Sequence, residues 1–258
     1  MGIDFEDQER LYGKKGTTRL KKSSKILMKF LKKNKIKTTF FIVGNVAREN
    51  QGIIEEIVLN EHEIACHSNN HIPLNYLDAK KFSIDLKKNK KILEEIGAKN
   101  IYGFRAPRFS LTEENKWAYE VLKDEGFKYS SSVLPGNPIE YGWKDIGTKP
   151  ILINKILEIP ITMIKFPFLS IPFGGVYLRL IPEVLLSKYI INKRGNQIIS
   201  YIHPYDFDFD QKPRGLDINY FKKKLLFYNR ISTYRKLNNL IKNFKTIKYI
   251  DYFNQIKK

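Results

Sequence analysis

The stretch E-I-A-C-H-S-N-N-H, residues 63–71, is the part of the chain around which the rest can be arranged. Its first four residues suit a short strand, and the strand is followed by two histidines four positions apart, His67 and His71. Residues four apart on one helical turn, or on a loop closing into such a turn, share a face and can hold a single ion. The chain has only 4 histidines, and histidine is the commonest metal ligand in proteins. The pair therefore predicts a metal site at the end of a strand, although an H-x-x-x-H pair by itself is also consistent with chance or with a helix start.

Outward from this stretch, strand patterns alternate with helix patterns. Residues 38–43, T-T-F-F-I-V, form a β-branched and aromatic run that ends at Gly44 and predict a buried strand. Residues 17–33 place their apolar side chains at helical spacing, and Asn45 is expected to cap a helix that continues to about residue 60. Further strands are predicted at residues 2–7, 63–66, 103–106, 127–131, 156–161 and 197–203, and further helices at 78–96, 112–125, 182–192 and 219–243. Such alternation indicates parallel βα units in a barrel or a doubly wound sheet.

The segment at residues 135–182 differs in character because glycine and proline are frequent and helical periodicity is absent. Residues 166–175 are expected to form an irregular loop over one face, and residues 245–252 a last strand or a helix end. No linker and no repeat of fixed period is visible. We therefore predict one domain over residues 1–258, with a Pro/Gly-rich insertion near 135–182.

Composition and charge limit the classes of function. The 42% hydrophobic content fits a folded globular protein, and the single cysteine, Cys66, predicts a buried apolar side chain rather than a disulfide. The net charge of +19 could indicate nucleic acid, but no nucleic-acid-binding signature accompanies it, and the lysines are spread over helical segments. A weak association with an anionic surface stays open. Without a signal-peptide pattern or a spanning apolar run, the expected location is cytoplasmic or peripheral to a membrane.

Polar residues follow four of the predicted strands. Ligand sites of parallel α/β sheets and barrels lie at the carboxyl ends of the strands, so residues that are scattered in the sequence should meet there. The residues concerned are Asp4, Glu6 and Asp7 in the first segment, His67 and His71 in the second, Arg105 with Pro107 in the third, and His203 in the last.

These residue types suit hydrolysis. Two imidazoles and one carboxylate make an open metal site, and the metal would polarise a carbonyl and activate water. A second carboxylate, kept ionised by Arg105, would serve as general base. His203 could protonate the leaving amine. The predicted reaction is hydrolysis of an amide or an ester.

Four motifs in this order, T-T-F-F-I-V-G, H-S-N-N-H, F-R-A-P-R-F-S and Y-I-H-P-Y-D, resemble the polysaccharide deacetylases of the NodB-homology type, carbohydrate esterase family four. The opening D-F-E-D and the later G-G-V-Y-L-R-L-I-P are similar to the branch of that family whose first motif reads D-V-E-D. The resemblance implies a distorted (β/α) barrel with fewer than eight parallel strands. It also implies removal of N-acetyl groups from amino sugars in a polysaccharide or glycan precursor, with a divalent metal, commonly zinc.

The resemblance also implies roles for individual residues. His67 and His71 match the two histidine ligands. Position by position, the first motif makes Glu6 the base and Asp7 the third ligand, and a shifted alignment makes Asp4 the base and Glu6 the ligand. The other matches are Arg105 with the arginine that orients the base, His203 with the general acid, and the backbone near Pro107 and Arg108 with the oxyanion-stabilising groups.

One departure from the family pattern stands out. An aspartate commonly follows the aromatic residue of the fourth motif, whereas Tyr129 is followed here by three serines, residues 130–132. His203 would then lack a carboxylate that tunes it, and the aspartates at 206, 208 and 210 are expected in a solvated loop without a role. Two alternatives therefore stay open: a related hydrolase of a small non-sugar amide, and a weakly active carbohydrate-binding relative. The oligomeric state is not predicted.

Overall fold

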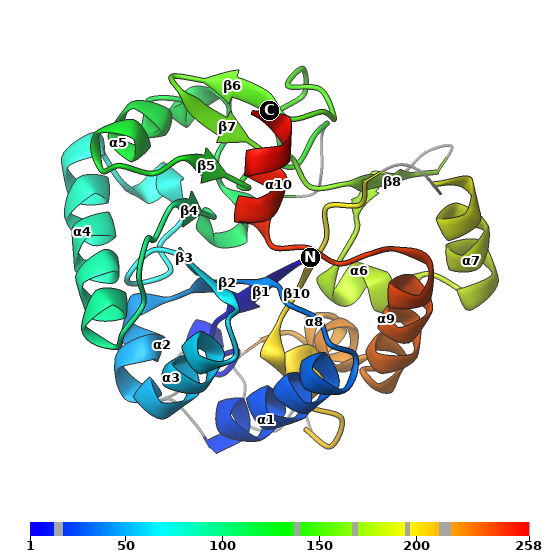
Figure 1. Ribbon diagram of the computed structural model, residues 1–258. Coiled ribbons are helices and arrows are strands. Elements are labelled where there is room, and N and C mark those ends of the chain that lie inside the picture. Colours follow the sequence, from blue (N-terminus) through cyan, green and yellow to red (C-terminus); the bar gives the residue numbers. More distant parts are fainter. Residues whose placement is uncertain (13–17, 137–139, 167–169, 194–196, 212–217, 258) are drawn as a thin grey trace.

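The computed structural model describes residues 1–12, 18–136, 140–166, 170–193, 197–211 and 218–257. A curled sheet runs through the molecule in the order β10-β1-β2-β3-β4-β5-β7-β6 (Figure 1). Every neighbouring pair is parallel except β6 and β7. The predicted distorted barrel with fewer than eight parallel strands is therefore confirmed. The strands are β1 (Gly2–Phe5), β2 (Thr39–Ile42), β3 (Glu63–Cys66), β4 (Gly103–Phe104), β5 (Tyr129–Ser130), β6 (Ile151–Ile153), β7 (Ile156–Glu158) and β10 (Tyr201–Ile202).

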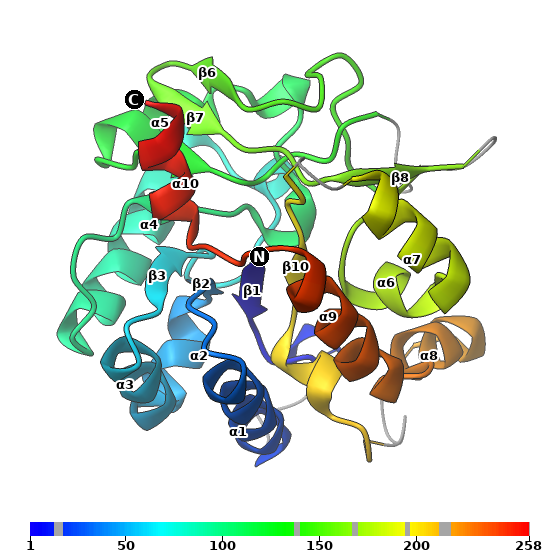
Figure 2. The same ribbon diagram turned by 45° about the vertical axis from the view of Figure 1, so that its right-hand side comes forward.

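Most of the helices lie around the outside of the sheet and bury an apolar stripe (Figures 1 and 2). In the first of them Leu20, Leu27 and Leu31 are buried while the lysines between them face outward. Asp78 caps the longest helix by accepting a hydrogen bond from Lys81 N at 2.8 Å. The helices are α1 (Thr18–Lys33), α2 (Gly44–Glu49), α3 (Gln51–Leu59), α4 (Ala79–Glu95), α5 (Ala118–Asp124), α6 (Gly175–Leu180), α7 (Glu183–Asn192), α8 (Tyr220–Phe227), α9 (Ile231–Asn243) and α10 (Tyr249–Ile256). No described helix is both long enough and apolar enough to span a bilayer.

Three local predictions were wrong. The helix expected from Asn45 to about residue 60 is broken at Asn50, whose φ of −130° and ψ of 36° are not helical, and the cap position is Val43. The helix expected at 219–243 is interrupted between α8 and α9. The expected loop at 166–175 contains β9 (Ser170–Pro172), which pairs antiparallel with β8 (Met163–Lys165); residues 167–169 lie outside the described part. The single domain with an insertion stays a prediction.

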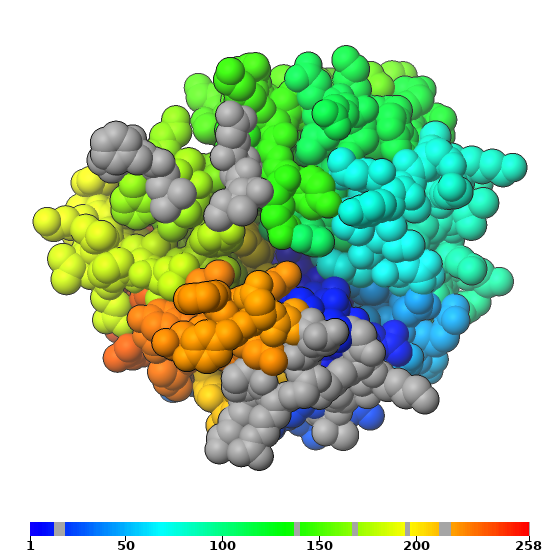
Figure 3. Space-filling model, turned by 180° about the vertical axis from the view of Figure 1, so that it is seen from behind, coloured from blue at the N-terminus to red at the C-terminus, as the bar shows by residue number. Residues whose placement is uncertain are grey.

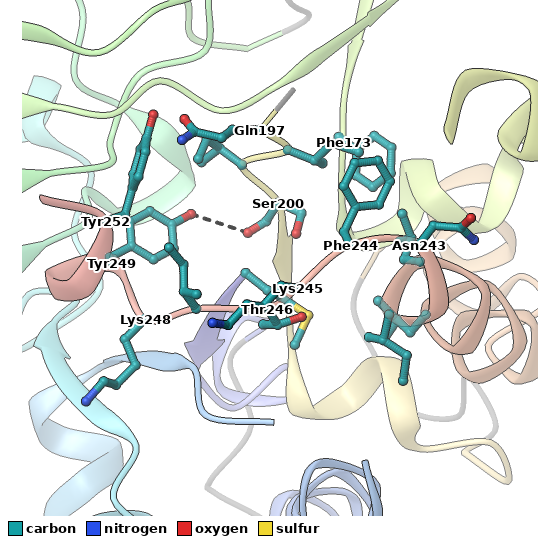
Figure 4. Close-up of a pocket in the computed structure, with 17 residues that line it drawn as sticks. Phe173, Gln197, Ser200, Asn243, Phe244, Lys245, Thr246, Lys248, Tyr249 and Tyr252 are labelled. Carbon is teal, nitrogen blue, oxygen red and sulfur yellow. Dashed lines mark hydrogen bonds between the residues drawn. The ribbon is translucent and has the colours of Figure 1, made fainter. Parts of the chain in front are cut away.

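The last helix, α10, fills the amino-terminal end of the half-barrel. Tyr249 and Phe253 pack there against Phe41 and Tyr129 from the strands. Beside α10 lies a cavity of about 320 Å³ lined mainly by apolar side chains, where the Tyr249 hydroxyl donates to Ser200 O at 3.4 Å (Figure 4). Because Ser200 precedes β10 and His203 follows it, this cavity is at the opposite end of the strands from the predicted site.

One buried histidine outside the predicted site should make stability depend on pH. Burial, with Lys37 and Lys248 nearby, lowers the pKa of His62 from 6.5 to about 4, and neutral His62 accepts a hydrogen bond from Thr38 N at 3.3 Å. Between these pKa values the unfolded chain binds more protons, so this contribution to stability is lost as pH falls from 6.5 toward 4. We expect the free energy of unfolding of the parent, measured by chemical denaturation, to fall between pH 7 and pH 5 by about 1 kcal/mol more than that of His62→Asn. The amide oxygen of the asparagine can still accept the hydrogen bond from Thr38 N. Parallel pH curves for the two proteins would contradict this.

Candidate active site

The carboxyl ends of the parallel strands open into a cleft of about 1020 Å³. Figure 3 views the molecule from this side, and the blue first residues lie in its hollow between green, cyan and orange segments. Asp4 and Glu6 are two residues apart in the extended chain of the first strand and its continuation, so their side chains lie on the same side and both point to the cleft. The residues that the sequence predicted to converge and that line the cleft are Asp4, Glu6, Asp7, His67, His71 and His203.

Glu6, His67 and His71 bring one ligand atom each within 4.8 Å of one another. The Glu6 Oε2 atom lies 2.6 Å from His71 Nε2 and 3.7 Å from His67 Nε2. Although His71 Nε2 is buried and close to the carboxylate, it has no hydrogen-bond partner in the described structure. Two imidazole nitrogens and one carboxylate, one of them a buried nitrogen without a hydrogen bond, are a donor set that fits a divalent metal such as zinc.

The loop that carries the two histidines is fixed by side chains around it. Arg105 O lies 2.8 Å from His67 Nδ1, which directs Nε2 of the same ring toward Glu6. Ser68 Oγ accepts from His71 N at 2.8 Å, and both Ser68 and His71 have positive φ, 61° and 57°. Of the two alternatives, a helical turn and a loop, the structure has a loop, and it brings both rings to one side. Asp85, on α4, holds this loop by accepting from Asn69 N at 2.7 Å.

Tyr205 was not predicted to be part of the site, yet it holds Glu6. Its hydroxyl donates to Glu6 Oε1 at 3.0 Å, which leaves Oε2 to face the histidines. Burial by itself would raise the pKa of Glu6, but His71, His67 and His203 outweigh it and keep this pKa well below 4.5. The Y-D of Y-I-H-P-Y-D was the signal that could have identified Tyr205.

Arg105 is fully buried and binds Asp4. Its Nη1 atom lies 2.6 Å from Asp4 Oδ1, while Nη2 donates to the Tyr249 hydroxyl at 2.8 Å and Nε to Ser131 O at 2.9 Å. The guanidinium also lies 3.9 Å above the ring of Phe41. Burial opposes its charge, but Asp4 and Tyr249 outweigh burial and raise the pKa of Arg105. The arginine thus holds the carboxylate of Asp4 in a fixed position.

Glycine at position 2 makes room for this arginine. A Cβ atom at Gly2 would lie 2.6 Å from Arg105 Nη1, too close for any side chain. The first strand therefore supplies both the carboxylate that Arg105 binds and the space in which its guanidinium lies.

The prediction for Asp206 and Asp208 was wrong because neither lies in a solvated loop. Asp206 is fully buried and Asp208 is 1% exposed. Asp206 Oδ2 lies 3.2 Å from His203 Nδ1 and accepts from His203 N at 2.9 Å, and Arg179 approaches Asp206 Oδ1 at 3.5 Å. Burial lowers the pKa of His203, but the hydrogen bond to Asp206 and the charges of Glu6, Asp206 and Asp4 outweigh it and raise this pKa. Asp210, by contrast, is exposed and pairs with Lys22.

The serines after Tyr129 have structural contacts in place of a carboxylate. Ser131 contacts Arg105 through its carbonyl and hydroxyl, and Ser132 Oγ accepts from Ala106 N at 2.8 Å. The carboxylate beside His203 comes instead from Asp206, three residues further along the chain. The cysteine is buried as predicted, and burial raises the pKa of the Cys66 thiol.

Asp7 lies in the cleft but apart from the cluster of Glu6, His67 and His71. Asp7 Oδ1 accepts from Glu9 N at 3.0 Å, and Asp7 is not among the three residues whose ligand atoms converge in the described part of the chain. His203 Nε2 lies 3.6 Å from Glu6 Oε1 and 4.0 Å from Asp4 Oδ2. This geometry favours the shifted alignment of D-F-E-D over the position-by-position one.

An α/β half-barrel with a histidine pair, two buried carboxylates and a buried arginine at its carboxyl edge has the features of a carbohydrate esterase fold. Residues 10–130 match the polysaccharide deacetylase family, and residues 131–254 match a domain of unknown function, DUF3473. Residues 10–130 therefore belong to the polysaccharide deacetylase family of the NodB-homology type. The predicted resemblance to that family is thereby confirmed. Residues 10–130 contain three of the four motifs, and Y-I-H-P-Y-D lies in the second matched region.

Solved structures share the fold at low sequence identity. A protein from Mycobacterium smegmatis, named as a polysaccharide deacetylase, is 16% identical with a TM-score of 0.62, covering 93% of this chain and 78% of that one. A pseudoenzyme of carbohydrate esterase family four from Bacillus anthracis is 16% identical with a TM-score of 0.53, covering 98% and 65%. The peptidoglycan deacetylase PdaC from Bacillus subtilis is 12% identical with a TM-score of 0.51, covering 99% and 89%.

Among curated proteins, the uncharacterized protein YlxY from Bacillus subtilis is 36% identical over 74 residues, which is 28% of this chain. The match spans 23% of the length of YlxY.

Proposed function

We propose that this chain is a metal-dependent deacetylase that hydrolyses the N-acetyl group of an amino sugar in a polysaccharide or a glycan precursor. The observation that carries the proposal is the arrangement of Asp4 between two partners. Its Oδ1 atom is bound by the buried Arg105, and its Oδ2 atom faces His203 beside the cluster of Glu6 and the two histidines. A base, an acid and a metal-binding group thus share one cleft.

The residues of the cleft and the side chains that hold them have defined roles in this mechanism. Glu6, His67 and His71 would hold a divalent ion. Their nitrogen and carboxylate donors suit zinc, which would act as a Lewis acid toward the acetyl carbonyl. Asp4 removes a proton from the attacking water, and Arg105 orients Asp4 for that step. The water oxygen bonds to the acetyl carbon, the C–N bond breaks, and His203 protonates the departing amine. Asp206 holds His203 in place for that step.

The assignment of Asp4 as base and Glu6 as ligand is the shifted alignment of the first motif. The contacts of Asp4 with Arg105 and of Glu6 with His71 support it, because a base needs an orienting partner and a ligand needs the other ligands beside it. Asp7 is not among the three residues whose ligand atoms converge in the described part of the chain. A contribution of the backbone near Pro107 and Arg108 to oxyanion stabilisation stays a prediction.

A direct assay tests the activity, because some members of the fold are pseudoenzymes. Purified protein loaded with zinc or cobalt is offered N-acetylated oligosaccharides of different sugars, and released acetate is measured against His203→Asn under the same metal loading. We expect metal-dependent acetate release that falls about 10²–10⁴-fold in the variant, the range for loss of one general acid. Metal binding without acetate release from any sugar would favour the non-catalytic or non-sugar alternatives.

A further inference from the structure

Helix α8 has an unusual surface, which we call the α8 rim and define as residues 220–225 with Tyr228 and Ile231. The helix reads Y-F-K-K-K-L-L-F, and none of its residues is buried. Phe221 is 82% exposed and Tyr220 67% exposed. A helix on a globular protein normally buries its apolar side chains against the body of the molecule. The α8 rim instead exposes three aromatic rings, those of Tyr220, Phe221 and Tyr228, beside three lysines, which is typical of a contact surface.

The helix is anchored firmly in spite of this exposure. Asn219 caps it by accepting from Lys222 N at 2.8 Å. At the other end Leu226 O accepts from Arg179 Nη1 at 3.1 Å and from Arg230 Nε at 3.4 Å. The Arg230 guanidinium also lies 4.3 Å from the centre of the Phe227 ring. Two buried arginines thus hold the backbone of α8. The helix has a fixed orientation, and in that orientation its aromatic side chains point outward.

Charge indicates the kind of partner. The sequence at 218–250 has many lysines and arginines and no aspartate or glutamate. A second copy docking through the same surface by two-fold symmetry would bring the lysines of one α8 against those of the other, which is unfavourable. Lysines beside exposed aromatic rings fit the headgroup region of an anionic lipid bilayer, where the rings insert at the interface and the ammonium groups meet phosphates.

The position of the α8 rim beside the cleft determines how the protein would be oriented on a surface that it contacts through α8. Lys222 and Leu225 line the cleft, and Lys222 Nζ lies 5.4 Å from the centre of the Tyr12 ring. Figure 3 shows the orange segment that contains α8 next to the blue first residues on the same face. A flat surface that contacts α8 would therefore meet the protein at the mouth of the cleft.

We propose that the α8 rim docks the protein peripherally on anionic phospholipid bilayers, with the mouth of the cleft beside the membrane surface. Docking in this orientation would bring the site to glycans held at a membrane, and this consequence alone rests on the proposed function. The binding itself follows from the exposed rings, the lysines and the anchoring of α8.

Sedimentation with vesicles tests the docking. The full-length protein is mixed with vesicles of phosphatidylcholine containing phosphatidylglycerol, and with vesicles of phosphatidylcholine alone, at two salt concentrations. We expect binding to the anionic vesicles that weakens at high salt. The double variant Lys223→Gln/Lys224→Gln should bind about 10-fold or more weakly, since each lysine near such a surface contributes on the order of 5-fold. Phe221→Ser should also weaken binding, without changing its salt dependence.

The matched control is Lys87→Gln/Lys91→Gln on α4, which removes the same charge from exposed positions elsewhere. We expect this control to bind anionic vesicles like the parent, and all variants to keep the parent's melting temperature. An equal loss of vesicle binding in the α4 control would show that only net charge matters, and it would overturn the proposal. Failure of the parent to bind anionic vesicles would also overturn it. A parent dimer in light scattering that Phe221→Ser converts to a monomer without vesicle binding would assign the rim to a second copy instead. Acetate release from a soluble oligosaccharide, measured in parallel, reports on the proposed function separately.

Discussion

Replacing Asp4 with asparagine is expected to lower turnover by about 10²–10⁴-fold while metal binding stays close to that of the parent. Asparagine keeps an oxygen that can accept from Arg105, so the packing around the guanidinium is preserved, but it cannot take a proton from water. The measurement is acetate release at saturating substrate, with zinc affinity determined by calorimetry on the same preparations. The pair of readouts separates a base from a ligand.

The reverse pattern would contradict this assignment. Should Asp4→Asn turn over substrate at the parental rate, the base is another group, and the position-by-position alignment with Glu6 as base becomes the better one. A melting temperature is needed beside the kinetics, because Arg105 is fully buried and loses its charged partner in the variant. An uncompensated buried charge costs on the order of several kcal/mol. A folded but inactive variant is the result that supports the base.

Replacing Glu6 with glutamine is expected to weaken zinc binding by at least about 100-fold, beyond the range for loss of an outer-shell contact. The physical reason is that Glu6 is the carboxylate whose oxygen lies 2.6 Å from His71 Nε2 in the cleft. Calorimetric titration of chelator-treated protein with zinc measures the effect. His71→Asn should lose affinity to a comparable extent.

Two matched variants sharpen this test. Tyr205→Phe removes only the hydroxyl that donates to Glu6 Oε1, so we expect a loss of about 10-fold in zinc affinity. Asp7→Asn makes the same carboxylate-to-amide change one residue further on, and its loss should be much smaller than that of Glu6→Gln. A larger loss in Asp7→Asn than in Glu6→Gln would return Asp7 to the ligand position.

Much of the fold was predictable because strands and helices have distinct periodicities. Residues 38–43 and 63–66 are largely apolar runs of strand length bounded by polar or glycine positions. They form β2 and β3, which are neighbours in the sheet, and β2 also pairs with β1. The breaks at Asn50 and between α8 and α9 were not predictable from apolar spacing, because the spacing continues across them. The hairpin of β8 and β9 lies in a glycine- and proline-rich segment in which pairing depends on tertiary contacts.

The site was predictable in outline but not in its contacts. Topology places residues after parallel strands at one edge, which is enough to gather Asp4, His67 and His203. Which oxygen faces which nitrogen depends on the side-chain directions along the first strand, and these are visible only in the structure. Asp206 was missed because a run of alternating aspartates suggests a solvated loop, whereas the partner that stabilises its burial, Arg179, is distant in sequence.

Tyr249 in α10 binds a guanidinium whose other partner, Asp4, lies near the first residue. The histidine pair and Arg105 fall in the first matched region, while His203 and this tyrosine fall in the second. During synthesis on the ribosome the contacts of Arg105 are therefore incomplete until α10 has emerged and docked. A nascent chain without α10 would hold this charged arginine without the hydroxyl of Tyr249 as a hydrogen-bond partner.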